Sequence, residues 1–382
     1  MTFSAPAVAA NVPMLRGLTS RSDMLGSVER IARTELAVLA QKIDAEGFYP
    51  EAQMRALGKA GAYAAHVSEA RAVQPDLYTA IRAMTLVSEQ CLSTSFCMWC
   101  QNALAWYVDN SENEAARAKF GAAVAAGDRL GGTGLSNPMK AFYGIERLRL
   151  KGRRVDGGYE VTGALPWVSN LGPDHLFATI FERNDVADPA SGRVMAVFDC
   201  AGPGVKIVEN DHFVALDGTR TFSVQFRDAF ISDDNVLADP LGTYLPRIRA
   251  GFILLQAGMA FGLIRNCIDL MVQVRGALGH VNKYLEKQPE HFETLLAELE
   301  AEVAELCETP YSQDPIYFRR VVEARLAAGE AAVEAAHYAM LHQGARGYVS
   351  NGAAQRRLRE AYFVAIVTPA TKQLRKMLAE MA

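Results

Sequence analysis

The spacing of apolar residues along the chain changes twice. Between about residues 20 and 127, apolar residues recur every three or four positions, beginning with residues 25–46. This is the period of a helix that buries one face. The same period predicts further helices at residues 50–59, 77–91, 96–107 and 112–126. We therefore expect the chain to begin with a helical domain, residues 1–129.

Short β-rich runs replace the helical pattern between residues 130 and 240. Turn residues such as those at 156–158 and 217–218 separate them. Strands that follow one another without helices between them are typical of antiparallel sheets, not of βαβ units. We expect an antiparallel β-barrel or sandwich here, with strands at residues 147–152, 159–163, 175–181, 194–198, 205–209 and 223–230.

The helical period returns after residue 240. Four long amphipathic stretches with short links predict an antiparallel four-helix bundle, residues 241–382. The predicted fold class is therefore α+β and multidomain, with a helical domain, a β-domain and a helical bundle. The four helices are expected at residues 244–275, 289–307, 314–342 and 353–381.

Composition narrows the classes of protein. Half of the residues are apolar, and 39 basic residues face 43 acidic ones, for a net charge of -4. This balance argues against a disordered chain and against a nucleic-acid binder. The longest mostly apolar stretch, residues 251–264, is shorter than a membrane span and predicts a buried helix, so no membrane partner is expected. Six scattered cysteines favour a reducing compartment, and we expect a cytoplasmic protein.

Several familiar signatures do not occur in the sequence. It has no dinucleotide-binding glycine motif, P-loop, H-E-x-x-H or G-x-S-x-G. Cys97 and Cys100 form a single C-x-x-C without a second ligand pair, which predicts buried thiols and no metal site. The first twelve residues lack a basic start and are expected to be a loose leader, not a signal peptide.

Residues 159–170, YEVTGALPWVSN, carry the most informative motif. Here the sequence resembles the acyl-CoA dehydrogenase superfamily, in which a strand with W-I-T-N lies in a middle β-domain between two helical domains. The resemblance implies that Trp167 packs beside a flavin. It also implies that Ser169, which follows Val168, hydrogen-bonds flavin N5 through its hydroxyl group. A fixed hydrogen-bond donor at N5 would orient the ring for hydride transfer.

The resemblance extends to both sides of this motif. Residues 134–138, GLSNP, resemble the family's T-E-P segment and imply that Leu135 and Ser136 contact the flavin. Bulkier residues at 139–144 replace the glycine-rich loop that follows in the family. The turn at Gly344 resembles G-G-x-G-[FY], which approaches the FAD of a neighbouring subunit. A homodimer or homotetramer with bound FAD, or FMN in its place, is therefore implied.

The chain departs from the family at the catalytic base. The family's glutamate, which removes the α-proton of an acyl thioester, is replaced by Thr368, whose hydroxyl group cannot serve as a base near neutral pH. Some members place the glutamate at a second position, which here is Gly251. Asp239 and Glu360 are acids that could supply a base, but the sequence does not bring either to the flavin.

The phosphate-binding motif is a second departure. Arg275 matches the family's R-x-x-F-G arginine only with a two-residue gap. A gapless alignment puts Ala277 at that arginine and Gln288 at the glutamine that follows it. Arginine would supply charge-assisted hydrogen bonds to the FAD pyrophosphate. The alternative is that Arg275 is a surface cation at a helix end.

Three functions fit these observations. The first, which the sequence slightly favours, is an acyl-CoA dehydrogenase-like oxidoreductase. It would desaturate an acyl thioester, pass a hydride to flavin N5 and depend on an electron acceptor. The second is a monooxygenase that uses reduced flavin from a separate reductase. The third is a non-catalytic, flavoprotein-like scaffold.

Overall fold

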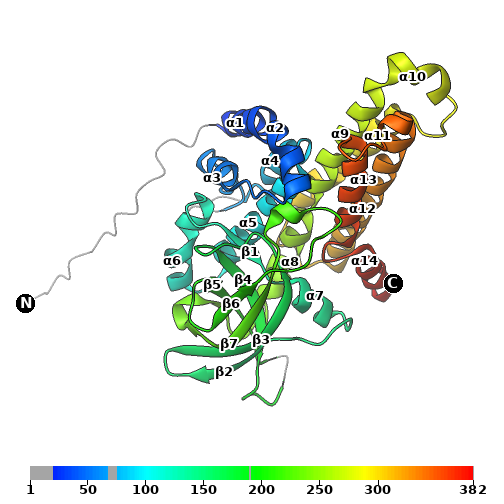
Figure 1. Ribbon diagram of the computed structural model, residues 1–382. Helices are drawn as coiled ribbons and strands as arrows, with labels where there is room; N and C mark the ends of the chain where they lie inside the picture. Colours follow the sequence, from blue (N-terminus) through cyan, green and yellow to red (C-terminus); the bar gives the residue numbers. More distant parts are fainter. Residues whose placement is uncertain (1–19, 68–74, 189–190, 382) are drawn as a thin grey trace, which may run out of the picture.

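The computed structural model describes residues 20–67, 75–188 and 191–381; the expected leader lies outside the described residues. A helical region, a sheet and a second helical region follow one another in the predicted order (Figure 1). The predicted fold class is confirmed, with differences in detail that concern the sheet and two helix breaks.

The first helical region surrounds a helix, α5, that is buried on nearly all sides. The sequence predicted this helix only at residues 96–107. Its first turn contains the polar residues Ser93, Thr94 and Ser95, which are buried although the pattern of apolar residues does not include them. A Ser20–Asp23 capping box fixes the start of the first helix. The helices are α1 (Arg21–Ile31), α2 (Ala37–Glu46), α3 (Glu51–Lys59), α4 (Leu77–Ser88), α5 (Leu92–Asn110) and α6 (Glu114–Ala125), with a π-helical turn at Ala32–Leu36 between α1 and α2.

The middle region is an eight-stranded sheet in the order β6-β7-β3-β2-β4-β5-β8, with β1 paired to β4. Most pairs are antiparallel as expected, but β1 and β2 each pair with β4 in parallel. The alternation of apolar and polar residues predicts where a strand lies but not which strand it pairs with, so these parallel pairs could not be predicted from the sequence. The strands are β1 (Gly131–Thr133), β2 (Lys151–Val155), β3 (Gly158–Val168), β4 (Leu176–Arg183), β5 (Arg193–Asp199), β6 (Val205–Val208), β7 (Phe222–Ser232) and β8 (Val236–Ala238); a short helix, α7 (Ser136–Phe142), and 3₁₀ turns at Asp217–Thr219 and Asp233–Asn235 interrupt them.

The last region has the four predicted helical stretches, two of which are broken. The first breaks after Leu254, and the last breaks before Pro369, because the residue preceding a proline avoids the helical conformation. The helices are α8 (Tyr244–Leu254), α9 (Ala257–Gln273), α10 (Arg275–Asn282), α11 (Pro289–Cys307), α12 (Pro315–Gln343), α13 (Ala353–Ile366) and α14 (Thr371–Glu380), with a 3₁₀ turn at Gly344–Arg346.

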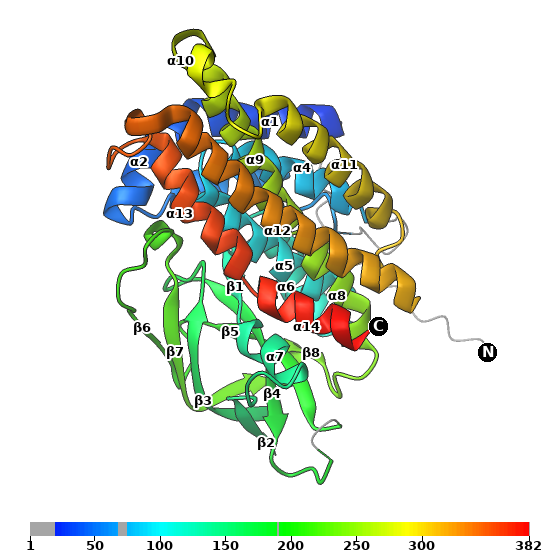
Figure 2. The same cartoon turned by 90° about the vertical axis from the view of Figure 1, so that its right-hand side faces the viewer.

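The two helical regions share one hydrophobic core. Helix α9 approaches α4 so closely that a Cβ atom on Gly262 would lie 2.2 Å from the Thr85 carbonyl oxygen. At the same contact, Ser88 Oγ donates a hydrogen bond of 2.7 Å to the Met259 carbonyl oxygen. The sheet lies on one side of this helical body, with α7 and α14 at the junction (Figure 2).

One described stretch, Tyr244–Gln273, is long and apolar enough to cross a membrane. Its most apolar window is 89% buried inside the protein. The stretch is therefore used as the core of the helical body, as its apolar run predicted.

Replacing Gly262 with alanine tests the α4–α9 contact. The added methyl group would overlap the Thr85 carbonyl oxygen, and we expect a loss of about 2–3 kcal/mol in the free energy of unfolding. Gly276→Ala is the control, because a Cβ atom there meets nothing within 4 Å. Denaturant unfolding measures both variants, and equal stability of the two would contradict the contact.

Candidate flavin-binding site

A pocket of about 480 Å³ lies where the sheet meets helices α5, α8 and α13. Its apolar wall comes from the helices, including Phe96, Trp99 and Phe363. Its polar wall is mainly a set of hydroxyl groups from the β-domain and from the loop after α13. The volume is within the usual range for a small-molecule or cofactor site.

Four of the predicted site residues line this pocket: Ser136, Trp167, Ser169 and Thr368. Ser136 Oγ and Thr368 Oγ1 lie 3.1 Å apart and share a hydrogen bond. Trp167 lies at the rim with its indole 47% exposed. The structure thus brings together two segments of the β-domain and the loop after α13 that the resemblance singled out.

Leu135 and Val168 do not line the pocket. Both side chains are buried, 1% and 0% exposed, beneath the residues that do. Leu135 belongs to the core shared with the helices, and Val168 to the core of the sheet. Their packing in the core holds in place the neighbouring residues that line the pocket, Ser136, Trp167 and Ser169.

Asn170 fixes the end of the W-V-S-N segment. Its backbone has a φ of 62°, a left-handed conformation that asparagine tolerates better than most residues. Its side-chain amide donates to the Gly131 carbonyl oxygen at 2.7 Å and accepts from the Tyr49 hydroxyl group at 2.6 Å. Its backbone N–H donates to the Thr219 carbonyl oxygen. The segment is thereby tied to the sheet, to the first helical region and to the loop before β7.

A chain of hydroxyl groups determines what Ser169 can offer the pocket. Thr219 Oγ1 donates to the Leu216 carbonyl oxygen at 2.7 Å, because a carbonyl can only accept. Thr221 must then donate to Thr219 at 2.8 Å, and Ser169 must donate to Thr221 at 2.7 Å. The hydrogen of Ser169 therefore points along the chain, and its oxygen is left as an acceptor.

The predicted phosphate-binding residues lie elsewhere. Arg275 and Ala277 are on α10, at the end of the helical body away from the sheet (Figure 1). Arg275 forms an exposed ion pair with Glu290. Gln288 Nε2 donates to two backbone carbonyl oxygens at 2.9 Å, and Gly344 begins the turn after α12 with a φ of 57°. None of these residues lines the pocket within one copy of the chain.

Neither of the two residues expected at the family's base positions, Thr368 and Gly251, is an acid. Thr368 has its hydroxyl group against Ser136, and its carbonyl oxygen accepts from Gln256 Nε2 at 2.9 Å. Gly251 packs against the indole of Trp106, where a Cβ atom would lie 2.5 Å from the ring. A glutamate side chain has no room at that position.

Glu360, the first of the two other acids, is buried and committed to an ion pair. Its carboxylate lies 2.8 Å from Arg357 and 3.9 Å from Arg356. The Arg357 side chain also donates to Asn266 and to the Glu89 carbonyl oxygen. Glu360 therefore holds α13 to its neighbours and does not line the pocket.

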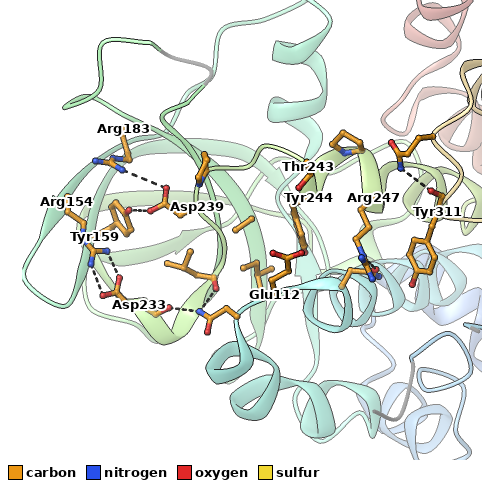
Figure 3. A pocket seen from close by; sticks show the side chains of 18 residues that line it. Glu112, Arg154, Tyr159, Arg183, Asp233, Asp239, Thr243, Tyr244, Arg247 and Tyr311 are labelled. Carbon is orange, nitrogen blue, oxygen red and sulfur yellow. Dashed lines mark hydrogen bonds and ion pairs between the residues drawn. The ribbon is translucent and has the colours of Figure 1, made fainter. Parts of the chain in front are cut away.

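Asp239, the second, lines a separate cavity of about 870 Å³ between the sheet edge and α8. Figure 3 shows its carboxylate facing Tyr159 and Arg183. Burial, together with the hydrogen bond to Asp239, raises the pKa of Tyr159 to about 12. Arg154 and Asp233 pair beside them, so the charges of this cluster are matched internally.

The pocket contains no acid or imidazole base. Among the described residues, no Asp, Glu or His lines it; its cations are Lys140 and Arg359. Burial raises the pKa of the Cys100 thiol, so this group stays protonated. Cys97 is buried as well, as predicted for the C-x-x-C pair.

Sequence reasoning missed several residues that shape the pocket: Lys140, Thr219, Thr221 and Gln256. Thr219 and Thr221 lie between the turn at residues 217–218 and the strand expected at residues 223–230. Lys140 stands in the loop that departs from the family, and that departure was the one available signal. Gln256 lies in an apolar run, where no motif marks it. The structure places it at the break between α8 and α9, where its side chain donates to the Thr368 carbonyl oxygen.

The comparisons with known proteins agree with the fold. Residues 20–128 match the family model "Acyl-CoA dehydrogenase, N-terminal domain". The human mitochondrial short-chain specific acyl-CoA dehydrogenase is 24% identical over 350 residues, covering 88% of this chain and 84% of that protein. Isovaleryl-CoA dehydrogenase from Oryza sativa is 24% identical over 163 residues, covering 41% of this chain and 39% of that protein.

Solved structures show the same fold along the chain. Butyryl-CoA dehydrogenase from Megasphaera elsdenii superimposes with a TM-score of 0.83 at 16% identity, covering 95% of this chain and 98% of that one. The FAD complex of PigA has a TM-score of 0.78 at 14% identity, covering 100% and 98%. The resemblance read from the sequence is confirmed: residues 20–128 match an acyl-CoA dehydrogenase N-terminal domain, and the chain has the fold of these structures.

Replacing Asn170 with glycine tests how the W-V-S-N segment is held. Glycine keeps the left-handed backbone but removes both side-chain hydrogen bonds, and we expect a loss of about 2–3 kcal/mol in the free energy of unfolding. Tyr49→Phe removes one of the two bonds and should cost about half as much. Chemical denaturation measures both, and an Asn170→Gly variant as stable as the wild type would refute this role.

Proposed function

We propose that this protein is an FAD-dependent oxidoreductase that works without a carboxylate base, in the manner of a reduced-flavin monooxygenase. One observation carries the proposal: among the described residues, the pocket that matches the flavin motif has no carboxylate or imidazole on its wall. Its substrate is a small molecule, and its electrons come from a separate flavin reductase.

The residues present fit a flavin. Trp167 offers an aromatic face at the rim, Ser136 and Ser169 offer hydroxyl groups, and the helical wall is apolar. Aromatic and apolar walls with a few placed polar groups are what an isoalloxazine ring requires. Arg275, Gln288 and Gly344 would reach a flavin only from a second copy of the chain, and we propose a homo-oligomer.

Dehydrogenation of an acyl thioester has little support in this pocket. A base must lie within hydrogen-bond reach of the α-proton and must be unprotonated near neutral pH. Thr368, the residue expected at the base position, lines the pocket but carries a hydroxyl group that stays protonated near neutral pH. Gly251 is sealed by Trp106, so a base cannot come from there.

Monooxygenation needs no such base. The reduced flavin supplies two electrons, with which O₂ delivers one oxygen atom to the substrate and loses the other as water. The protein's own part is to bind and orient the two reactants and to exclude water. Phe96, Trp99 and Phe363 provide an apolar wall for that purpose.

Ser169 favours the reduced state of the flavin. The hydroxyl chain leaves the Ser169 oxygen as an acceptor. Flavin N5 carries a hydrogen only when the ring is reduced, so an acceptor complements the reduced form and not the oxidised one. This polarity agrees with an enzyme that takes up flavin already reduced.

Thr221→Val tests this polarity. The variant frees the Ser169 hydrogen to donate to N5, and one hydrogen bond of ordinary strength should favour oxidised flavin about fivefold. The midpoint potential of the bound flavin should fall by about 20 mV. Thr243→Val is the control, because Thr243 lies in the other cavity. Equal potentials in Thr221→Val and the wild type would contradict the assigned direction of the hydroxyl chain.

Anaerobic spectroscopy of the purified protein with FAD tests the reaction itself. We expect FAD to bind, a panel of acyl-CoAs to leave the visible absorption of oxidised FAD unbleached, and reduced FAD with O₂ to give a transient absorbance distinct from that of oxidised FAD. Bleaching by an acyl-CoA would overturn the proposal in favour of dehydrogenation. Protein that takes up neither FAD nor FMN would favour a scaffold.

Thr368→Glu separates a lost base from a lost substrate site. If the pocket still bound acyl thioesters productively, the new carboxylate would restore bleaching by acyl-CoA. Because we propose a different substrate, we expect no bleaching, with Thr368→Gln as the uncharged control. Acyl-CoA oxidation by the Glu variant alone would show that only the base had been lost.

A further inference from the structure

Lys140 lines two neighbouring cavities, the flavin pocket and a second one. The second cavity, the outer groove, measures about 1050 Å³ and lies between α12, α13, α14 and the loop before β2. Tyr362 and Ile366 also line both spaces. These two residues are largely exposed, 57% and 64%, and make the boundary around Lys140 apolar. The Lys140 side chain is therefore within reach of a ligand at this boundary.

Of the two cations on the pocket wall, Arg359 is already occupied. It forms two hydrogen bonds to the Asp44 carboxylate and one each to the Val214 carbonyl oxygen and to Gln355. Nearly all its five N–H donors are therefore used. It braces α13 against α2 and the loop before β7, and has little left for a ligand.

Lys140 retains open donors. Its ammonium group carries three hydrogens, and among the described residues it donates to Glu146 alone, at 3.1 Å. Glu146 is itself shared: it accepts from Asn137 Nδ2 at 3.0 Å and lies 3.7 Å from the guanidinium group of Arg149. Two cations thus face one carboxylate, which leaves this edge of the pocket net positive.

The backbone that carries Lys140 is held in place. The hydroxyl group of Ser136, at the start of α7, shares a hydrogen bond with the hydroxyl group of Thr368. The Met139 carbonyl oxygen accepts from Gln373 Nε2 of α14 at 3.1 Å in a buried contact. A charged group on a fixed element makes a more specific binding site than one on a mobile loop.

We propose that Lys140 anchors a carboxylate group of the substrate at the boundary between the flavin pocket and the outer groove. The rest of the substrate then lies on the apolar, flavin side. An ammonium group with open donors beside an apolar wall forms a charge-assisted hydrogen bond to a carboxylate, and a neutral amide of the same shape gains much less. This inference rests on the proposed function, since it names the substrate class of the same site.

Binding of matched acids and amides tests the anchor. Benzoate with benzamide, and hexanoate with hexanamide, are titrated by calorimetry into the protein with and without FAD. The wild type should bind each acid about tenfold tighter than its amide. Lys140→Met should abolish that preference by weakening the acids alone. Glu146→Gln removes the competing carboxylate and should strengthen acid binding several-fold.

Lys151→Met is the matched control. Lys151 pairs with Glu182 as Lys140 pairs with Glu146, but it lines neither cavity, so the preference for acids should persist. Equal affinity for acids and amides in the wild type, or a preference that survives Lys140→Met, would overturn the anchor. Protein that takes up no FAD yet keeps a Lys140-dependent preference would overturn the proposed function and leave the anchor standing.

Discussion

The hydrogen bonds of Asn170 hold the pocket together. This residue closes the strand that carries Trp167 and Ser169, and its side chain joins the first helical region to the sheet through Tyr49 and Gly131. Because Asn170 is buried and its backbone is left-handed, it fixes the end of this segment. The pocket residues Trp167 and Ser169 are therefore positioned by polar contacts between regions that are distant in the sequence.

The helical body provides the opposite wall. Helices α4 and α9 come from the two ends of the chain yet share a core, and their close contact at Gly262 makes the two helical regions one unit. The break between α13 and α14 turns Thr368 toward Ser136. A buried guanidinium group, Arg325, donates to Gln256, which in turn donates to the Thr368 carbonyl oxygen. These hydrogen bonds hold the loop that carries Thr368 against the helical body.

The chemistry of the pocket follows from what each wall can offer. Hydroxyl groups, one occupied arginine and one open lysine can orient, accept and bind, but they cannot remove a proton from carbon near neutral pH. The fold is that of acyl-CoA dehydrogenases, whereas the side chains suit a reaction driven by the cofactor. The packing of the helices and the sheet specifies the fold, whereas the side chains that line the pocket specify which reaction it can support.

The sequence by itself determined the order of helices, strands and helices, because periodicity is a local property that neighbouring residues reveal. Its resemblance to the family at the W-V-S-N segment, at residues 134–138 and at Thr368 also pointed to Ser136, Trp167, Ser169 and Thr368, which line one pocket. Only the tertiary structure decided the parallel strand pairs, the polarity of the hydroxyl chain and the position of Lys140. Contacts such as that between Ser136 and Thr368, 232 residues apart, depend on how distant elements pack, which no local pattern records.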